Sequence, residues 1–311
     1  MKIVFMGTPD FAATILQKLI DEQYDVALVV SQPDRPVGRK KELLPTPAKK
    51  IAQKYQIETF QPEKIKMDYQ MIQDVLPDLI ITAAYGQLIP KALIDLPRLG
   101  CINVHASLLP KYRGGAPIHQ AIIDGESETG ITIQYMEVAM DTGDMIAQES
   151  LPISPFDDVG TLFYKLGISG ADLLIKTLPA IQNGTNDRIP QNHEAATYAS
   201  NIKREDEWID WSKTAQEIHN QIRGLNPWPT AYTSINGINI KVFKSEMNTD
   251  QHMDLPPGKL LTVNDEHLAV TCGNQTILYL TEVQLAGKKR MSLRDLLNGD
   301  SPLQVGEMLG R

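Results

Sequence analysis

The chain has 311 residues, of which 42% are hydrophobic and 22% are charged, and its formal net charge is −8. This length allows two domains, and the composition is typical of a globular protein rather than a disordered one. The negative net charge argues against bulk electrostatic attraction to nucleic acid, although a local basic patch is compatible with it. No apolar run is long enough to span a membrane, so no membrane partner is expected.

Cysteine and metal-ligand patterns indicate a reduced compartment. The two cysteines, Cys101 and Cys272, lie in apolar, strand-like runs and are expected to be buried free thiols. Neither a CxxC nor an HExxH pattern occurs, so no metal is expected. The apolar strand predicted over 2–6 leaves no room for a signal peptide. Together these features predict a cytoplasmic protein.

The first part of the chain alternates short apolar strands with helices. The strands are predicted over 2–6, 24–31, 57–60, 78–83, 99–105 and 131–138. The helices are predicted over 11–22, 45–55, 67–76 and 161–182. This alternation predicts an α/β fold with a Rossmann-like, doubly wound and mostly parallel sheet.

The turn after the first strand resembles a dinucleotide-binding fingerprint only in part. Gly7 lies between strand and helix, but Pro9 stands where the second glycine of GxGxxG would be. Without that glycine the backbone does not approach a pyrophosphate closely. A helix start that packs against the sheet is therefore the preferred interpretation of Gly7.

The character of the chain changes near residue 200. A charge-rich stretch over 202–207 is followed by a helix over 214–224 and by the breaker Asn226-Pro-Trp-Pro229. Short strands are then predicted over 231–235, 238–246, 258–263, 268–272 and 277–284, with a terminal helix over 292–298. This spacing predicts a small OB-like β-barrel. The expected domains are 1–203 and 204–311.

The segment from Cys101 to Pro117 carries the strongest chemical pattern. Asn103 and His105 are two residues apart in a predicted strand, so their side chains share one face. The following loop places the pair near the carboxyl end of the strand, where ligands bind in open α/β sheets. A donor amide beside an imidazole suits a reaction that builds negative charge on an oxygen and moves a proton. A buried histidine with a purely structural hydrogen bond is the alternative.

A second motif, Met140-Asp-Thr-Gly-Asp144, strengthens the catalytic interpretation. It follows an apolar strand and ends in a turn, so the Asp141 carboxylate is placed to orient the imidazole and stabilise its charged form. Ser107 lacks a nucleophile-elbow context, and Cys101 lies deeper in the strand. Asn103, His105 and Asp141 thus predict amide or acyl transfer without a covalent nucleophile.

These motifs closely resemble those of the methionyl-tRNA formyltransferases, within the folate-dependent formyltransferase family. The similarity runs nearly end to end and includes Met6-Gly-Thr-Pro-Asp-Phe11, Gln32-Pro-Asp-Arg-Pro36, Ala84-Tyr-Gly86, Asn103-Val-His105 and Ile222-Arg-Gly-Leu-Asn-Pro-Trp-Pro229. The resemblance implies transfer of a formyl group from 10-formyltetrahydrofolate to the α-amine of initiator methionyl-tRNA. Asn103 would donate to the oxyanion, while His105 and Asp141 would share the proton transfers in one of two ways that the sequence leaves open.

The folate co-substrate is expected beside the same strand ends. In formyltransferases of this kind, the segment matching Ser107, Leu108, Leu109 and Pro110 lines the folate site. The residues Ala84, Tyr85, Gly86, Gln87 and Leu88 follow the strand over 78–83 and offer backbone groups to a pterin edge. Ordinary loop packing is the alternative for both segments.

A local basic stretch is the expected tRNA contact. Residues 31–50 hold Arg35, Arg39, Lys40, Lys41, Lys49 and Lys50 against Asp34 and Glu42, a local net charge of +4. The segment 33–47 is predicted to be an exposed loop, and the resemblance implies that this insertion enters the acceptor stem. Arg39 is the main candidate, with Arg35, Lys40 and Lys41 behind it. Lys288, Lys289 and Arg290 form a second candidate cluster.

Other functions share parts of this pattern. A folate-dependent formyltransferase acting on a small amine, such as glycinamide ribonucleotide or an amino sugar nucleotide, would share the site but would need neither the basic loop nor the second domain. A nucleotide-dependent oxidoreductase or a non-catalytic nucleotide-binding module is disfavoured by the broken glycine fingerprint. A folate hydrolase would use water as the acceptor. Nothing in the sequence requires more than a monomer.

Overall fold

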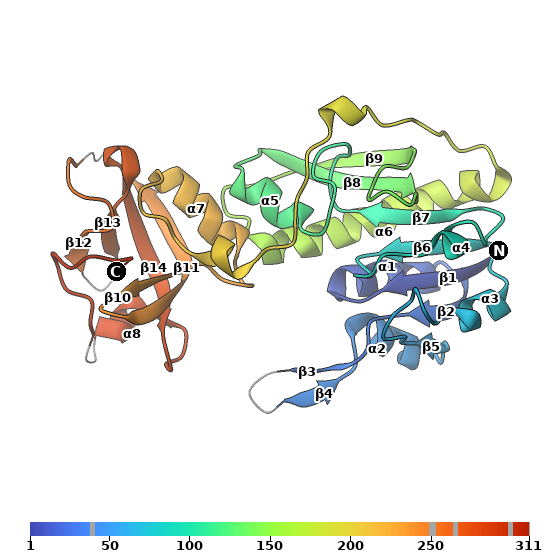
Figure 1. Ribbon diagram of the computed structural model, residues 1–311, viewed down its shortest axis with the longest axis horizontal. Coiled ribbons are helices and arrows are strands. Elements are labelled where there is room, and N and C mark those ends of the chain that lie inside the picture. Colours follow the sequence, from blue (N-terminus) through green and yellow to red (C-terminus); the bar gives the residue numbers. More distant parts are fainter. Residues whose placement is uncertain (38–40, 249–252, 264–266, 298–300, 311) are drawn as a thin grey trace. The chain divides into compact units, whose positions relative to one another are not determined.

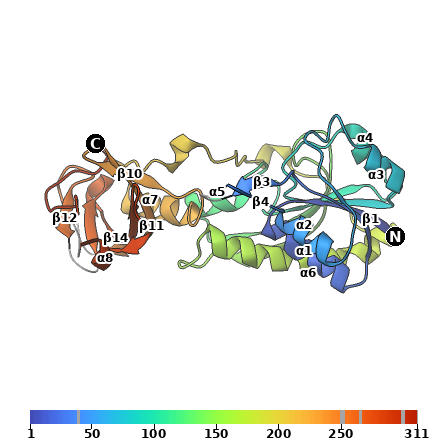
Figure 2. The ribbon, with the colours of Figure 1, turned by 90° about the horizontal axis from the view of Figure 1, so that it is seen from below.

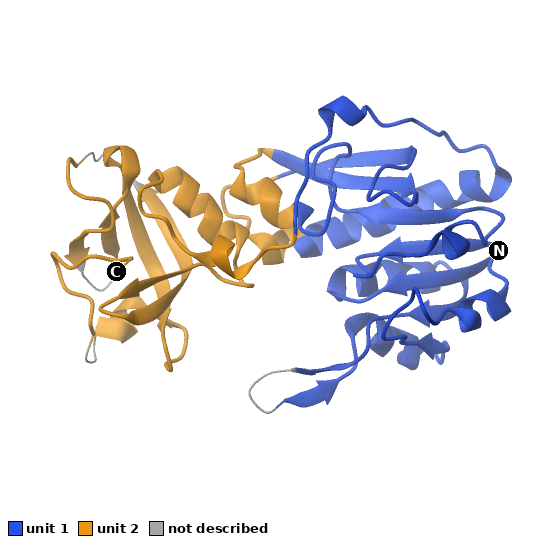
Figure 3. Ribbon diagram, in the orientation of Figure 1, with its two compact units in different colours: residues 1–117, 128–152, 163–200 blue, residues 118–127, 153–162, 201–311 orange. Residues whose placement is uncertain are grey.

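The computed structural model describes residues 1–37, 41–248, 253–263, 267–297 and 301–310 (Figure 1). The chain forms two compact units (Figure 3). Unit 1 comprises Met1–Pro117, Glu128–Pro152 and Phe163–Ser200, and unit 2 comprises Ile118–Ser127, Ile153–Leu162 and Asn201–Arg311. Each unit therefore contains segments that are distant in the sequence.

Unit 1 is built on a seven-stranded sheet with the order β5-β2-β1-β6-β7-β8-β9. The strands are β1 Lys2–Gly7, β2 Asp25–Val30, β5 Thr59–Phe60, β6 Leu79–Ala83, β7 Cys101–His105, β8 Glu128–Tyr135 and β9 Met145–Pro152. All pairs from β5 to β7 are parallel, whereas β8 and β9 are added antiparallel. This sheet confirms the predicted mostly parallel, Rossmann-like class.

Helices cover both faces of this sheet. They are α1 Asp10–Asp21, α2 Pro47–Lys54, α3 Gln70–Val75, α4 Lys91–Ile94 and α6 Val159–Asn183, whose first turn belongs to unit 2. Figure 2 shows α1 and α6 on one face and α3 and α4 on the other. A Cβ atom at Gly7 would lie 2.5 Å from the Cβ of Ala12 in α1, so Gly7 allows the helix to pack closely on the sheet.

The structure differs from the sequence prediction at the basic segment. The predicted loop over 33–47 instead contains a two-stranded hairpin of β3 Arg35–Val37 and β4 Glu42–Leu44. Its side chains do not alternate in burial, because the four residues from Lys41 to Leu44 are all exposed. The periodicity that identifies a half-buried strand is therefore missing from the sequence.

Besides the hairpin, three elements of the first part were not predicted. Helix α4, Lys91–Ile94, is only four residues long. Strand β9 lies at the sheet edge, where only Ile146 is buried, and it contains polar residues such as Glu149 and Ser150. Helix α5, Pro117–Ile123, follows directly after the Gly-rich loop and is only seven residues long. Short or polar elements of this kind carry a weak hydrophobic pattern.

Unit 2 contains an antiparallel six-stranded sheet, as the predicted fold class requires. The path β10-β11-β14-β13-β12 comprises β10 Tyr232–Ile235, β11 Ile238–Asn248, β14 Ile277–Leu285, β13 Leu268–Thr271 and β12 Leu260–Val263, and β15 Met291–Ser292 pairs with β14. Helices α7 Ala215–Gly224 and α8 Leu293–Leu297 contribute Ile218, Ile222 and Leu293 to its hydrophobic core.

Both cysteines are buried and free, as predicted. Among the described residues, no helix is long and apolar enough to cross a membrane.

Candidate active site

Strand β7 presents the two polar side chains on one face of the unit 1 sheet. In the antiparallel pairing with β8, Asn103 lies opposite Gln134 and His105 lies opposite Thr132. Directly opposed residues share a face, so these four polar side chains lie together on one face of the sheet. His105 is buried, whereas Asn103 remains partly accessible.

Asn103 is oriented by a neighbouring strand. Its Oδ1 accepts a hydrogen bond of 2.8 Å from Oγ1 of Thr82 in β6. In this orientation the amide nitrogen is at the other end of the side chain, where it has no partner among the described residues. Asn103 therefore presents two unused N–H donors at a partly accessible position.

The tautomer of His105 follows from its surroundings. The ring Nε2 lies 3.0 Å from the carbonyl oxygen of Tyr112, and a carbonyl only accepts, so Nε2 carries hydrogen. In the neutral ring, Nδ1 is then the basic nitrogen. It lies 3.6 Å from Oδ1 of Asp141. A proton added at Nδ1 would therefore face the Asp141 carboxylate, which stabilises a positive charge on the ring.

Asp141 is held by donors on both of its carboxylate oxygens. Oδ2 accepts 2.8 Å from the backbone N–H of Gly114, and Oδ1 accepts 3.0 Å from Nε2 of Gln134. The residue has φ of 53°, a left-handed conformation that aspartate tolerates better than most residues. These contacts hold the carboxylate in a fixed position, with Oδ1 directed towards Nδ1 of His105. The predicted convergence of imidazole and carboxylate is therefore present in unit 1.

Comparison with known proteins decides the family. A family model described as "Formyl transferase" matches residues 1–178, and one described as "Formyl transferase, C-terminal domain" matches residues 201–301. The chain is 54% identical to the methionyl-tRNA formyltransferase of Staphylococcus epidermidis over 99% of both chains. It is 52% identical to that of Halalkalibacterium halodurans, over 100% of this chain and 98% of the relative. The chain belongs to the methionyl-tRNA formyltransferases.

Solved structures with lower identity show the same fold. WlaRD, a sugar 3N-formyl transferase determined with dTDP and 5-N-formyl-THF, has a TM-score of 0.67 at 21% identity and covers 93% of this chain and 99% of its own. HypX from Aquifex aeolicus with tetrahydrofolic acid has a TM-score of 0.65 at 16% identity and covers 96% of this chain and 47% of its own. The formyltransferase fold thus extends over both units of the chain.

In this formyltransferase, the first predicted folate segment is fixed against β8 and β9. Oγ1 of Thr132 donates to the Ser107 carbonyl at 2.7 Å and accepts from the Leu109 N–H at 3.1 Å. Nε2 of Gln148 donates to the Leu109 carbonyl at 2.8 Å. Leu108 packs close to Gly130, where an added Cβ would lie 2.5 Å from its Cδ2. The segment 107–110 is therefore a rigid edge next to His105.

The second predicted folate segment follows β6. The carbonyl of Tyr85 accepts from Oγ1 of Thr8 and from Nε2 of Gln32, both at 3.1 Å. The side chain of Gln87 accepts from the N–H of Ile65 at 2.8 Å, so it links two loops. Ala84, Gly86 and Leu88 are exposed. Their role in binding folate stays a prediction.

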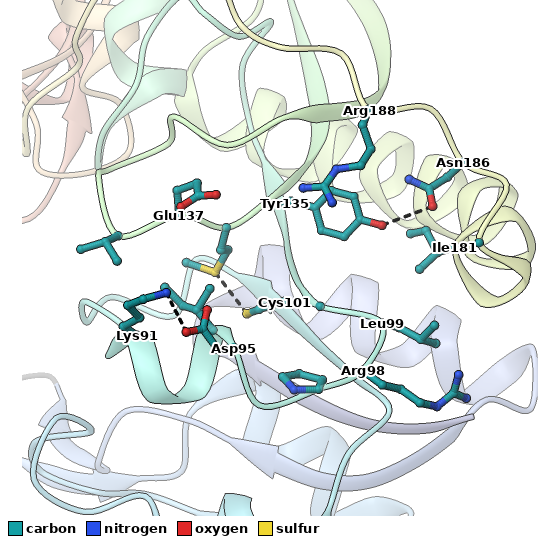
Figure 4. Close-up of a pocket in the computed structure, with 16 residues that line it drawn as sticks. Lys91, Asp95, Arg98, Leu99, Cys101, Tyr135, Glu137, Ile181, Asn186 and Arg188 are labelled. Atoms are coloured by element: carbon teal, nitrogen blue, oxygen red, sulfur yellow. Dashed lines mark hydrogen bonds and ion pairs between the residues drawn. The ribbon is translucent and has the colours of Figure 1, made fainter.

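A pocket of about 400 Å³ opens beside the amino end of β7 (Figure 4). None of the predicted folate residues lines it. Its lining includes Lys91, Cys101, Tyr135, Met136, Glu137 and Arg188. Thr82 Oγ1 lies 3.4 Å from Sδ of Met136 and also donates to Asn103. The Thr82 hydroxyl therefore contacts both Met136 in the pocket wall and the Asn103 amide.

The residues predicted to contact tRNA differ in solvent exposure and in whether they already form an ion pair. Arg35 and Lys41 lie exposed on the β3–β4 hairpin, while Arg39 and Lys40 lie outside the described residues. Lys288 and Lys289 are exposed in a turn of unit 2. The guanidinium of Arg290 is paired with Glu282 and lies 4.2 Å from the ring centroid of Phe243. The role of these residues in binding tRNA stays a prediction.

Sequence reasoning missed the residues that surround Asp141. Gln134 was recoverable, because the antiparallel partner of a catalytic strand places side chains on the same face. Arg113 lies within the segment that carries the strongest motif, yet a single arginine there is expected to be a surface residue. Gln191 lies far away in the sequence and in an irregular segment, so no local pattern identifies it.

Proposed function

We propose that this chain transfers the formyl group of 10-formyltetrahydrofolate to the α-amino group of methionyl initiator tRNA. The observation that carries the proposal is the pairing of His105 Nδ1 with Asp141 Oδ1 at 3.6 Å, next to an Asn103 amide whose nitrogen is unused. Family membership over the whole length of the chain supplies the substrate class. The proposed setting is the cytoplasm, where translation begins.

The proposed reaction is a displacement at the formyl carbon. The lone pair of the α-amine forms a new N–C bond, and the carbonyl electrons move onto oxygen. Asn103 Nδ2 would donate to this oxyanion, a role that is worth about 3–4 kcal/mol where one such donor has been removed. Collapse of the intermediate breaks the bond from carbon to the folate nitrogen, which takes up a proton.

The proton that leaves the amine has a ready acceptor. Because Nε2 of His105 is engaged by the Tyr112 carbonyl, the free base is Nδ1, and the imidazolium that forms faces Asp141. The proton then passes to the folate nitrogen either from His105 or through Asp141 and a water. These groups form a complete set for amide transfer, so the proposal invokes no metal.

The binding roles in the proposal follow the predicted residues. The rigid segment 107–110 and the turn 84–88 would hold the folate, since both flank strands that carry the polar face. The exposed basic residues Arg35 and Lys41, with Arg39 and Lys40, would contact the tRNA backbone, as would Lys288, Lys289 and Arg290. All three catalytic side chains belong to unit 1 of one chain, which supports a monomer as the working form.

One assay tests the proposed substrate. The formyl donor is supplied with methionyl initiator tRNA, with glycinamide ribonucleotide, or with no acceptor, and its consumption is followed. We expect rapid consumption only with the charged tRNA. Equal turnover with the small amine would support the small-amine alternative, and turnover without an acceptor would indicate a hydrolase.

A further inference from the structure

A buried arginine lies behind the active site without a carboxylate partner. Arg113 is 2% exposed, and in the described part of the chain no carboxylate lies within ion-pair distance of its guanidinium. Its side-chain partners are an amide and an imidazole. Nε and Nη2 donate to Oε1 of Gln191 at 3.1 and 2.7 Å, and Nη2 lies 3.1 Å from Nδ1 of His193. Burying an unpaired cation is costly, so this arrangement calls for a compensating role.

The Arg113 guanidinium determines which end of the Gln191 amide donates and which end accepts. Since arginine only donates, the end of the Gln191 amide that faces it must be oxygen. The amide nitrogen of Gln191 then points to three oxygens: the carbonyl of Gly143 at 2.8 Å, the carbonyl of Asp141 at 2.9 Å, and Oε1 of Gln134 at 3.3 Å. The two carbonyls only accept hydrogen bonds, so they require the amide nitrogen on their side. Arg113 and the carbonyls therefore both require the Gln191 oxygen to face Arg113.

The same order of donors and acceptors continues through Gln134 to the Asp141 carboxylate. With its Oε1 facing Gln191, the Gln134 amide must present Nε2 to Asp141, and it donates there to Oδ1 at 3.0 Å. The main chain adds a parallel connection, because Gly114, which follows Arg113, donates its N–H to Oδ2 of Asp141 at 2.8 Å. Gln191 also holds the backbone of the strained residue Asp141.

We propose that Arg113 and Gln191 are positioning residues for formyl transfer, which set the orientation of the Gln134 amide and thereby fix the Asp141 carboxylate against His105. The inference rests on the proposed function, because formyl transfer is the activity that it modulates. A flipped Gln134 would turn its oxygen towards Asp141 and repel it. The charged and titratable groups of this network are Arg113, His193, Asp141 and His105.

The variant Gln191→Glu tests directly whether the hydrogen bonds donated by the Gln191 amide are needed. A carboxylate at 191 pairs with Arg113, which favours a folded protein, but it cannot donate to Gln134 or to the 141 and 143 carbonyls. We expect kcat to fall at least tenfold, with KM for both substrates changed less than twofold. We also expect the acidic limb of the kcat–pH profile to move to higher pH, since Asp141 loses stabilisation of its charged form. Gln182→Glu, the same change at an exposed position of α6, should leave both unchanged.

A double variant separates positioning from general damage. In an Asp141→Asn background, Gln191→Glu should cost less than a further twofold in kcat, because the residue acts through a carboxylate that is gone. Gln134→Met is a second test, which serves if Gln191→Glu fails to fold. It removes the Nε2 donor to Asp141 while keeping the side-chain volume, and it should give the same fall in kcat and the same pH shift.

The outcomes distinguish a failure of the proposed formyl transfer from a failure of the positioning role of Arg113 and Gln191. Wild-type protein that forms no formylmethionyl-tRNA would contradict the proposed function. Active wild-type protein together with normal kcat and an unshifted pH profile in Gln191→Glu and Gln134→Met would overturn the positioning role alone. Additive losses in the double variant would also overturn it.

Discussion

At the residue scale, each proposed catalytic side chain is oriented by a hydrogen bond to one of its polar atoms. Thr82 occupies the oxygen of Asn103, the Tyr112 carbonyl occupies Nε2 of His105, and two N–H donors occupy Asp141. Among the described residues, the Asn103 amide nitrogen has no partner, and Nδ1 of His105 faces Oδ1 of Asp141 at 3.6 Å. These are the donor and the base that an amine attack on a formyl group requires.

Removing the hydroxyl of Thr82 should weaken catalysis without touching substrate. In Thr82→Val the shape is kept, but the Asn103 amide loses the bond that orients it. We expect kcat to fall by about tenfold, because a misoriented donor stabilises the oxyanion less well. Steady-state kinetics, with thermal unfolding as the control for folding, measure the effect. An unchanged kcat would mean that the amide is oriented without Thr82.

Neutralising Asp141 should have a larger effect. An amide at 141 cannot accept from Gln134 and Gly114 in the same way, and it cannot stabilise an imidazolium at His105. We expect Asp141→Asn to lower kcat by on the order of 10² or more. Asp144→Asn is the matched control, since Asp144 pairs with Arg188 at a partly exposed position. Equal losses in both variants would indicate damage to the loop rather than loss of a catalytic group.

At the element scale, the sequence predicts the strands that build the site better than the loops that complete it. Strands β1 and β6 are largely apolar, and in β7 the period of two placed Asn103 and His105 on one face correctly. The orientation of Asp141 depends on Gln134 and Gly114, which are 7 and 27 residues away. Gln134 could have been inferred from the pairing of β7 with β8, whereas the contact of Gly114 with Asp141 leaves no periodic signal and emerges only from the structure.

The capping box of α7 makes a stability prediction for unit 2. Oγ1 of Thr214 accepts from the Glu217 N–H at 3.3 Å, and the Glu217 carboxylate accepts from the Thr214 N–H at 2.8 Å. We expect Thr214→Ala to lower the free energy of unfolding by about 1 kcal/mol. Glu217→Gln should cost less, because its amide oxygen still accepts. Chemical denaturation measures both, and a neutral Thr214→Ala would show that the cap contributes nothing.

The buried His119 and the half-buried His219 should make the stability of unit 2 depend on pH. Burial, with a smaller contribution from Arg223, lowers the pKa of His219 to about 4, and burial lowers the pKa of His119 to about 4. The unfolded chain binds these protons below a pKa of about 6.5, so stability is lost as pH falls from 6.5 towards 4. Each histidine should cost about 2 kcal/mol by pH 5. Urea unfolding of His219→Gln should lose about half of this pH dependence, and an unchanged dependence would contradict the assignment.

At the scale of the whole molecule, a net charge of −8 has to be reconciled with a polyanionic substrate. The hairpin β3–β4 concentrates basic residues in one exposed element, and unit 2 adds Lys288 and Lys289 in a turn. Local basic groups of this kind bind phosphates even when the protein as a whole is acidic, and the binding weakens as salt increases. Each unit therefore carries its own candidate contact with RNA.

Charge reversal on the hairpin should affect the tRNA selectively. We expect Arg35→Glu with Lys41→Glu to raise KM for methionyl-tRNA at least tenfold, while KM for the folate donor changes less than twofold. The dependence of log KM on log salt should become shallower by about 1 for each phosphate that the hairpin no longer binds. Lys66→Glu, an exposed lysine of the same unit, is the control. Equal effects on both substrates would contradict a specific role of the hairpin in binding tRNA.

The most direct test of the catalytic account is the rate of formylmethionyl-tRNA formation in a single turnover, measured for wild-type protein and for Asn103→Ala with both substrates saturating. The account predicts rapid formation by the wild type and a rate at least 10²-fold lower in the variant, with unchanged affinity for both substrates. A variant that forms the product at close to the wild-type rate would contradict the account, because the oxyanion would then be stabilised elsewhere.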